Sequence, residues 1–134
     1  MPRTPFDIPD AELAVMQQLW AVGSTTVREL TDAVYPGGGT SHYATVQKLL
    51  DRLEAKAFVR RYRDAWPHRF EATITRDELI ERQLKSTANR LCDGALHPLL
   101  MQLVRSTPLS AAERVSLREL LDELDKERQR PKKK

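Results

Sequence analysis

Cysteine is almost absent from this sequence: Cys92 is the only one among 134 residues. A single cysteine cannot build a disulfide framework within one chain, and it is typical of a protein in a reducing cytoplasm. The three histidines have no metal-ligand spacing with it, since neither an HxxxH nor a CxxC motif occurs. We therefore expect no metal site and no cofactor.

Long apolar runs and catalytic patterns are also missing. No stretch approaches the roughly 18 apolar residues of a membrane-spanning helix, and the N-terminal MPRTPFDIPD lacks the apolar segment of a secretory signal. We expect a cytoplasmic protein without membrane insertion. The glycines Gly37 to Gly39 lack the Lys-Ser/Thr of a phosphate loop, and no paired carboxylates or Ser/His arrangement stands out. We do not expect an enzyme.

The composition that is present is that of a folded protein. With 40% hydrophobic and 31% charged residues, the chain fits one domain, or one compact module with an appendage. The net charge of +3 is unevenly placed: residues 41–74 carry seven basic and four acidic side chains, whereas residues 1–40 carry two and five. Such a basic stretch is either an ordinary solvated surface or one that binds nucleic acid.

Apolar residues at helical spacing predict three helices in the first part of the chain. The first covers about Asp10 to Val22. The second is capped by Thr25 or Thr26 and ends at Tyr35-Pro36, and the third covers about Ser41 to Ala57. The apolar stripe of the third helix consists of Val46, Leu50, Leu53 and Ala57. Two short strands follow, at Phe58-Val59 and at Phe70, Ala72 and Ile74, with turn residues between them. This is the order of a winged helix-turn-helix, which we assign to residues 1–74.

The remainder is predicted to be all-helical, which makes the fold class mainly α with a small β-hairpin. Residues 75–127 hold more apolar side chains than isolated helices can bury, namely Leu79, Ile80, Leu84, Leu91, Leu96, Leu99, Leu100, Leu103 and Val104. A second copy of the chain would cover them, so we expect a homodimerisation region; packing back onto the first part is the alternative. The basic residues 128–134 are expected to form a disordered tail.

The outward face of the third predicted helix is small, polar and basic. A step of about 100° per residue from Val46 places Ser41, Ala44, Thr45, Lys48, Arg52 and Ala55 opposite the buried stripe. Thr45 can contact a thymine methyl or a phosphate, and Lys48 and Arg52 can reach phosphates or guanine. Alternatively, Lys48 and Arg52 are ordinary solvated residues and Ser41 only caps the helix. Tyr43, at the edge of the stripe, is either packed or close enough to contact a phosphate.

The predicted hairpin is rich in arginine. Arg60, Arg61, Arg63 and Arg69 cluster about its turn, together with Tyr62, Trp66 and His68. The planar guanidinium group suits phosphate oxygens and narrow minor grooves, and a wing lies beside the DNA backbone. The helix and the hairpin together predict binding to double-stranded DNA, with Arg61, Arg63 and Arg69 as wing contacts.

Several segments resemble the penicillinase repressor (BlaI/MecI) family of winged-helix transcriptional regulators, to which the copper-responsive CopY repressors are related. They are LAVMQQLW, TVREL, YATVQKLLDRLEAKAFV, HRFEATITRDEL and LSAAERVSLRELLDEL, within about residues 8–125. The resemblance implies a homodimeric repressor whose winged helix binds half of a palindromic operator. By matching positions, it implies DNA contacts from Ser41, Tyr43, Thr45, Lys48, Arg52 and Arg69.

The resemblance leaves the inducing signal open. Staphylococcal-type repressors are inactivated by proteolysis of an Asn-Phe bond through a membrane sensor protease, and the aligned pair here is Gln102-Leu103. CopY-type members bind metal through clustered C-terminal cysteines, which this chain lacks. Relief by proteolysis, metal or a small ligand therefore stay alternatives. The family also usually has glycine where this chain has Ala57, between the third helix and the wing.

A function of another class is a winged-helix protein-interaction module, in which the helical part binds a different partner and the basic face is incidental. Sequence-specific, twofold-symmetric DNA binding would separate the two hypotheses. A monomer in solution would count against the repressor.

Overall fold

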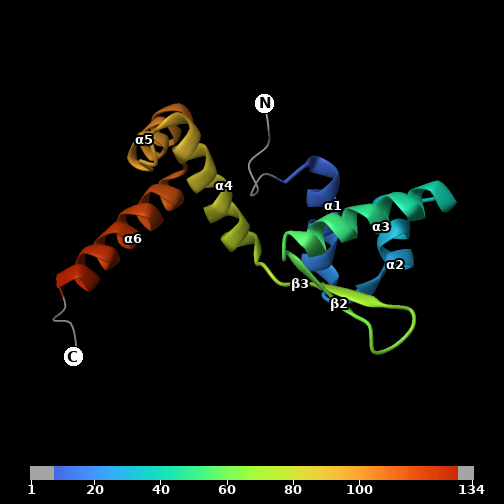
Figure 1. Cartoon of the computed structure of the whole chain (residues 1–134). Helices are drawn as coiled ribbons and strands as arrows, with labels where there is room; N and C mark the ends of the chain where they lie inside the picture. The colour runs from blue at the N-terminus through green and yellow to red at the C-terminus, as the bar shows by residue number, and fades with distance from the viewer. Residues whose placement is uncertain (1–7, 130–134) are drawn as a thin grey trace. The chain divides into compact units, whose positions relative to one another are not determined.

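The computed structural model describes residues 8–129, which divide into two compact units after Gly94. The first unit contains α1 (Asp10–Val22), β1 (Thr25–Thr26), α2 (Val27–Val34), α3 (Thr40–Ala55), β2 (Val59–Tyr62), β3 (Arg69–Ala72) and α4 (Arg76–Leu91), and the second contains α5 (His97–Ser106) and α6 (Ala111–Gln129) (Figure 1). The prediction of a mainly helical chain with a winged helix-turn-helix is confirmed. Within the described range, every helix is too short or too polar to cross a bilayer.

The first two helices are separated by a turn that also starts the sheet. Gly23, with φ of 84°, ends α1 and donates its N–H to the Leu19 carbonyl at 2.8 Å. Thr26 then caps α2 by accepting the Glu29 N–H at 3.2 Å. The same threonine belongs to β1, which the sequence analysis missed because two residues give no alternating pattern.

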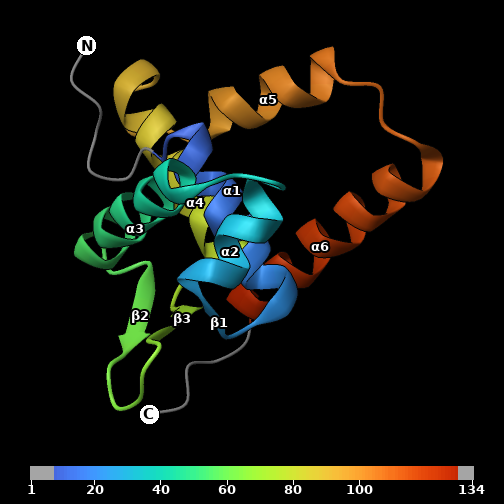
Figure 2. The same cartoon turned by 90° about the vertical axis from the view of Figure 1, so that its right-hand side faces the viewer.

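The three strands form an antiparallel sheet in the order β1-β3-β2. Phe70 of β3 faces Thr25 on one side and Arg61 on the other, so β3 is the central strand. Figure 2 views the hairpin from a second direction, with the loop between β2 and β3 extending past the strand ends. This hairpin is the predicted wing.

The core of the first unit lies between α1, α2, α3 and the sheet. Its buried apolar residues are Val15, Met16, Leu19, Leu30, Val46, Leu49, Leu50, Leu53, Phe58, Val59, Phe70, Ile74 and Leu79. The predicted stripe of α3 is therefore correct at Val46, Leu50 and Leu53. It is wrong at Ala57, which is exposed and lies beyond the last helical residue.

The end of α3 explains the difference at Ala57. The Ala57 N–H bonds to the Glu54 carbonyl, and the Phe58 N–H reaches back to the Leu53 carbonyl at 2.9 Å, which is the Schellman pattern of a helix C-terminus. The pattern requires a left-handed residue, and Ala57 has φ of 64°. Leu53 and Phe58 make the accompanying apolar closure, since both are buried in the core.

The N-terminal part of helix α4 packs against the winged helix. Thr75 caps it by accepting the Glu78 N–H at 3.1 Å, and Leu79 is only 4% exposed within the core. Arg82 lies over the Phe58 ring at 5.7 Å. The assignment of Leu79 to a surface covered by a second chain is therefore wrong, because Leu79 belongs to the core of the first unit.

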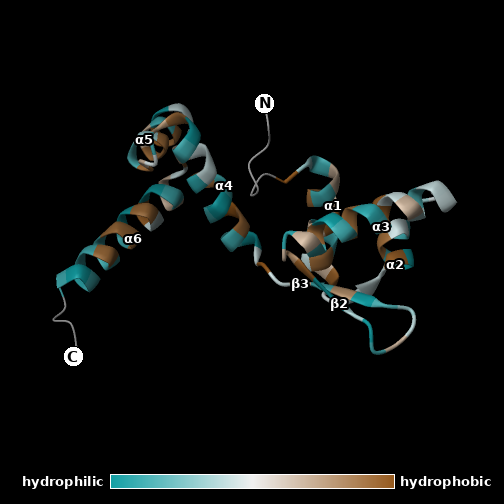
Figure 3. Cartoon of the chain, viewed as in Figure 1, coloured by the Kyte–Doolittle hydropathy of each residue, from teal (hydrophilic) through white to brown (hydrophobic). Residues whose placement is uncertain are grey.

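The second unit has a different character. Its helices α5 and α6 contain no buried residue, and apolar stripes run along both (Figure 3). A groove of about 390 Å³ between them is lined by Val104, Thr107, Leu109, Arg114, Leu117, Arg118 and Leu121. Arg128 and Gln129, expected in the tail, are helical, and residues 130–134 lie outside the described residues.

Candidate nucleic-acid interface

The outward face of α3 is exposed along its length. Ser41, Thr45, Lys48 and Arg52 are all exposed, as is the small Ala44. Among the described residues, neither the Lys48 nor the Arg52 side chain makes an ion pair or hydrogen bond. The two cations are therefore free to bind an external anion.

The start of α3 differs from the sequence-based alternative. The N-cap is Gly39, so Ser41 lies in the first turn and does not cap the helix. The Ser41 carbonyl accepts the Thr45 hydroxyl at 3.0 Å, which turns the threonine oxygen toward its own helix and leaves the methyl group for other contacts. Tyr43 is half-buried and lines two grooves, one of them shared with Ala44 and the other with Thr40.

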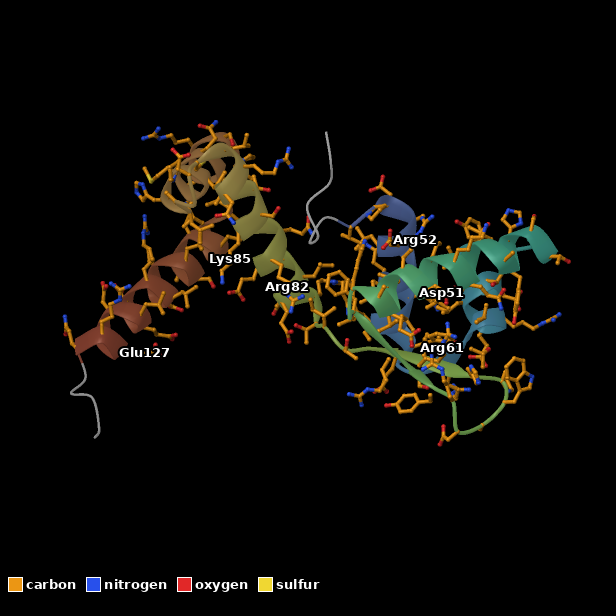
Figure 4. All side chains as sticks on the ribbon, viewed as in Figure 1. Asp51, Arg52, Arg61, Arg82, Lys85 and Glu127 are labelled. Carbon is orange, nitrogen blue, oxygen red and sulfur yellow. The ribbon has the colours of Figure 1, made fainter. Side chains whose placement is uncertain are left out.

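Arg61 of β2 is held inside the protein rather than presented to solvent. Its Nη2 donates to Asp51 Oδ1 of α3 at 2.7 Å, and its guanidinium lies 4.8 Å from the centre of the Phe70 ring. Glu54 is 4.0 Å from its Nε. The Arg61 side chain is consequently only 20% exposed. Figure 4 labels Arg61 and Asp51 where the hairpin meets α3.

The other two predicted wing arginines also have partners. Arg63 Nη2 donates to both carboxylate oxygens of Glu54, at 3.3 and 3.1 Å, with its side chain 59% exposed. Arg69 donates to the Ser24 hydroxyl at 3.0 Å and to the Ser24 carbonyl at 2.7 Å, yet it stays exposed. The backbone bond fixes the direction of Arg69, whereas Arg63 is held only by a surface ion pair.

A groove of about 890 Å³ brings the helix face and the wing together. It is lined by Thr26, Val27, Arg28, Glu29, Asp32, Tyr43, Ala44, Gln47, Lys48, Asp51, Arg61, Trp66, Pro67, His68, Arg69 and Phe70. Its charges almost cancel: Arg28, Lys48, Arg61 and Arg69 face Glu29, Asp32 and Asp51. Sequence reasoning missed the α2 residues of this groove, although their helical spacing could have placed them on one face.

Glu29 remains ionised in this groove. The Thr25 hydroxyl donates to its carboxylate at 2.6 Å and lowers the pKa of Glu29, and the charge of Arg69 lowers that pKa further. Hydrogen bonds to the charged form of a carboxyl group favour that form. The groove therefore carries fixed negative charge beside its cations at neutral pH.

The wing tip carries an exposed aromatic ring. Trp66 is 82% exposed, and its ring meets that of His68 edge-on with the centroids 5.0 Å apart. Both residues line the groove that holds Lys48. An apolar ring in this place can pack on sugars or bases, a use that the arginine count did not predict.

The profile of the family described as penicillinase repressor matches residues 8–123. The chain belongs to the penicillinase repressor family. It is 24% identical over 126 residues to the penicillinase repressor of Staphylococcus aureus, covering 94% of this chain and 99% of that protein. It is 32% identical over 118 residues to the transcriptional regulator BlaI of Mycobacterium tuberculosis, covering 87% and 83%. The solution structure of the DNA binding domain of the repressor BlaI matches with 24% identity and a TM-score of 0.46, covering 58% of this chain and 93% of that one.

Gln102-Leu103, the pair that the sequence analysis considered as a proteolytic switch, lies in the middle of α5. Gln102 and Leu103 are exposed, and their carbonyls accept bonds from the Ser106 hydroxyl and the Thr107 N–H. A protease that binds extended chain would have to unwind α5 first. In residues 8–129, no group of three or more His, Cys, Asp or Glu side chains is placed to hold a metal ion.

Proposed function

We propose that this member of the penicillinase repressor family is a sequence-specific DNA-binding transcriptional repressor of the cytoplasm. One observation carries the proposal: the exposed face of α3 presents two cations without intramolecular partners, beside an exposed wing. The relatives are named as a repressor and as a transcriptional regulator, which supports the same activity here.

In the proposed complex, α3 enters the major groove. Lys48 and Arg52 contact phosphates or guanine edges, and the Thr45 methyl contacts a base. Ser41 and Tyr43, in the first turn, lie close to a phosphate, where the uncapped N–H groups of the helix also favour negative charge. Arg69 contacts the neighbouring backbone from the wing.

The proposed repressor is a homodimer that binds a palindromic operator. The support is the row of exposed leucines and valines on α5 and α6, which a second copy would cover: Leu100, Leu103, Val104, Leu117, Leu120, Leu121 and Leu124. A symmetric pair of winged helices binds two half-sites separated by about one helical turn of DNA or a multiple of it.

Repression is proposed to end when a membrane sensor protease leads to cleavage between Gln102 and Leu103. The exposure of this pair supports the site, and its position inside α5 implies that unwinding precedes cleavage. Loss of α6 from the chain would then remove part of the dimer surface and release the operator.

The test is a fluorescence-anisotropy titration at about 150 mM salt with the DNA upstream of the protein's own gene and with a scrambled duplex. Specific repressors prefer their operator by roughly a thousandfold or more. Lys48→Ala and Arg52→Ala are each expected to weaken operator binding about tenfold. Arg90→Ala, on the exposed side of α4, loses the same charge and is the control. Unchanged binding in both α3 variants would remove this helix from the contact.

Absence of binding to either duplex would overturn the proposal. The chain would then fit the alternative of a winged-helix protein-interaction module. Equal, salt-sensitive binding to both duplexes would contradict sequence recognition on this promoter while leaving phosphate binding in place.

A further inference from the structure

Two arginines of the wing are matched to two carboxylates of the recognition helix. Arg61 meets Asp51 at 2.7 Å, and Arg63 meets Glu54 at 3.1 Å. Each pair joins the hairpin to the C-terminal half of α3. The cations expected to bind phosphate thus already have an anion.

The two pairs differ in how firmly they are held. Arg61 is pressed between the Phe70 ring and the acids of α3, and its buried Nε has no hydrogen-bond acceptor among the described residues. Asp51 is 64% exposed, so this carboxylate stands at the surface over which DNA would pass. Arg63 and Glu54 form a more open pair, with the arginine side chain 59% exposed.

A DNA phosphate approaching the wing meets this arrangement as a competitor. To bind Arg61 it must displace Asp51, and the displaced carboxylate then lies unpaired beside a second negative charge. The other charges of the groove attract the phosphate only weakly, because its fixed positive and negative charges nearly cancel. They therefore do little to offset the loss of the Arg61–Asp51 ion pair. A cation that keeps its carboxylate releases no counterions from DNA and adds nothing to the salt dependence of binding.

We propose that Asp51 and Glu54 are intramolecular competitors of DNA phosphates that restrain the wing arginines and lower the affinity for DNA of any sequence. The inference rests on the proposed function and deepens it: α3 supplies the reading contacts, while its two acids limit the electrostatic contacts of the wing. Arg61 stays paired with Asp51 in the wild-type complex.

The opposite role for the same geometry is that the acids position the arginines for DNA. Replacing Asp51 by its uncharged amide distinguishes the competing role from the positioning role. If the acids compete, Asp51→Asn strengthens DNA binding; if they position, Asp51→Asn weakens it. The amide has the shape of the acid at an exposed site, so the fold is expected to persist, and a thermal melt followed by circular dichroism checks this.

The experiment measures binding of the full chain to the promoter and scrambled duplexes from about 50 to 300 mM salt. In Asp51→Asn, both affinities are expected to rise about three- to tenfold, with a log–log salt slope steeper by about 0.9 per bound chain, the value for one added phosphate contact. The factor is the same for both duplexes because phosphate contacts carry no sequence information. Glu54→Gln gives a second, independent variant through Arg63.

The matched control is Glu81→Gln. Glu81 is also exposed and ion-paired, to Lys85 at 2.8 Å, but α4 lines no part of the groove. It reports the effect of one added unit of net charge alone. A further variant, Asp51→Asn with Arg61→Gln, is expected to lose the gain, because the freed arginine is its source.

Equal effects of Asp51→Asn and Glu81→Gln would overturn the inference, and so would weaker binding of Asp51→Asn. Equal binding of the wild-type chain to both duplexes would contradict the proposed sequence recognition. Binding to the scrambled duplex would still test whether Asp51 and Glu54 compete with DNA phosphates. A wild-type chain that binds no DNA removes the proposed function, and the inference with it.

Discussion

The two units of this chain carry similar apolar stripes but use them differently. Residues 8–94 bury every fully buried apolar side chain of the described structure, whereas α5 and α6 bury none. In the first unit, helices and a sheet cover one another. In the second, two helices expose their leucines. A helical apolar pattern therefore establishes a helix and one face of it, but not the surface that covers that face.

The largest expected effect is on the free energy of unfolding, when leucine is replaced by alanine in each of the two units. Leu50→Ala removes a fully buried side chain of α3 and is expected to cost about 3 kcal/mol of unfolding free energy, within the range for buried leucines. Leu120→Ala, at a position 51% exposed in α6, is expected to leave unfolding of the first unit unchanged. Urea unfolding followed by tryptophan fluorescence reports the first unit alone, since Trp20 and Trp66 both lie in it. Equal costs would contradict the distinction between the units.

The next effect concerns what covers the second unit. Leu121→Glu places a charge on the apolar face of α6, at a position 61% exposed, and is expected to weaken homodimerisation at least about tenfold because the carboxylate would be desolvated at the interface. Sedimentation equilibrium over a range of concentrations measures the dissociation constant.

The control for this change is Lys126→Gln. It alters the net charge by the same amount, about 140° around the helix from Leu121. Equal dissociation constants for the wild type and Leu121→Glu would exclude this face from the interface.

A smaller effect tests the first unit at Ala57, a non-glycine residue with a left-handed backbone. Ala57→Gly is expected to stabilise the chain by about 1 kcal/mol, because a left-handed conformation disfavours any side chain and glycine adopts it freely. Ala55→Gly, two residues earlier and still helical, is expected to lose up to about 1 kcal/mol. Urea unfolding measures the change in unfolding free energy in each variant, which is expected to have opposite signs in the two. The same sign in both would contradict the Schellman end of α3.

The sequence predicted those features that depend on local periodicity and capping. The bounds of α1 and the buried face of α3 at Val46, Leu50 and Leu53 both follow from spacing and residue type. Leu79 was misassigned because its spacing in α4 is the same whether it packs on the first unit or on another chain. The fold was therefore more predictable than the packing.

The wing illustrates the same limit at the candidate site. Its position and its arginines were evident from the turn and the strands. The pairing of Arg61 with Asp51 depends on how the hairpin folds back on α3, and the Arg69 bonds to Ser24 join residues 45 positions apart. A count of charges cannot distinguish a free cation from one that a carboxylate already holds.

The smallest expected effect concerns the hydrogen bonds between Ser110 and Glu113 at the start of α6. The Ser110 hydroxyl accepts the Glu113 N–H at 3.1 Å, and the Ser110 N–H donates to the Glu113 carboxylate at 3.0 Å, forming a capping box. The Ser110 backbone N–H is the main cause of a lowered pKa of Glu113. Ser110→Ala removes the hydroxyl and loosens the box, so the pKa of Glu113 is expected to rise toward its ordinary value. Carboxyl NMR titration measures it, with Glu81, whose pKa is lowered by Lys85, as the internal control.

The pH dependence of α6 follows from the sign of that shift. A carboxyl group whose pKa is lower in the folded helix stabilises the helix at pH values above its ordinary pKa of 4.5, and this contribution is lost as the pH falls through the lowered value. Far-UV circular dichroism from pH 6 to 3 should therefore show less acid-induced loss of helix in Ser110→Ala than in the wild type. An identical loss in the two proteins would mean that the capping box does not hold the start of α6. In that case the second unit depends on its partner surface for helix formation as well as for burial.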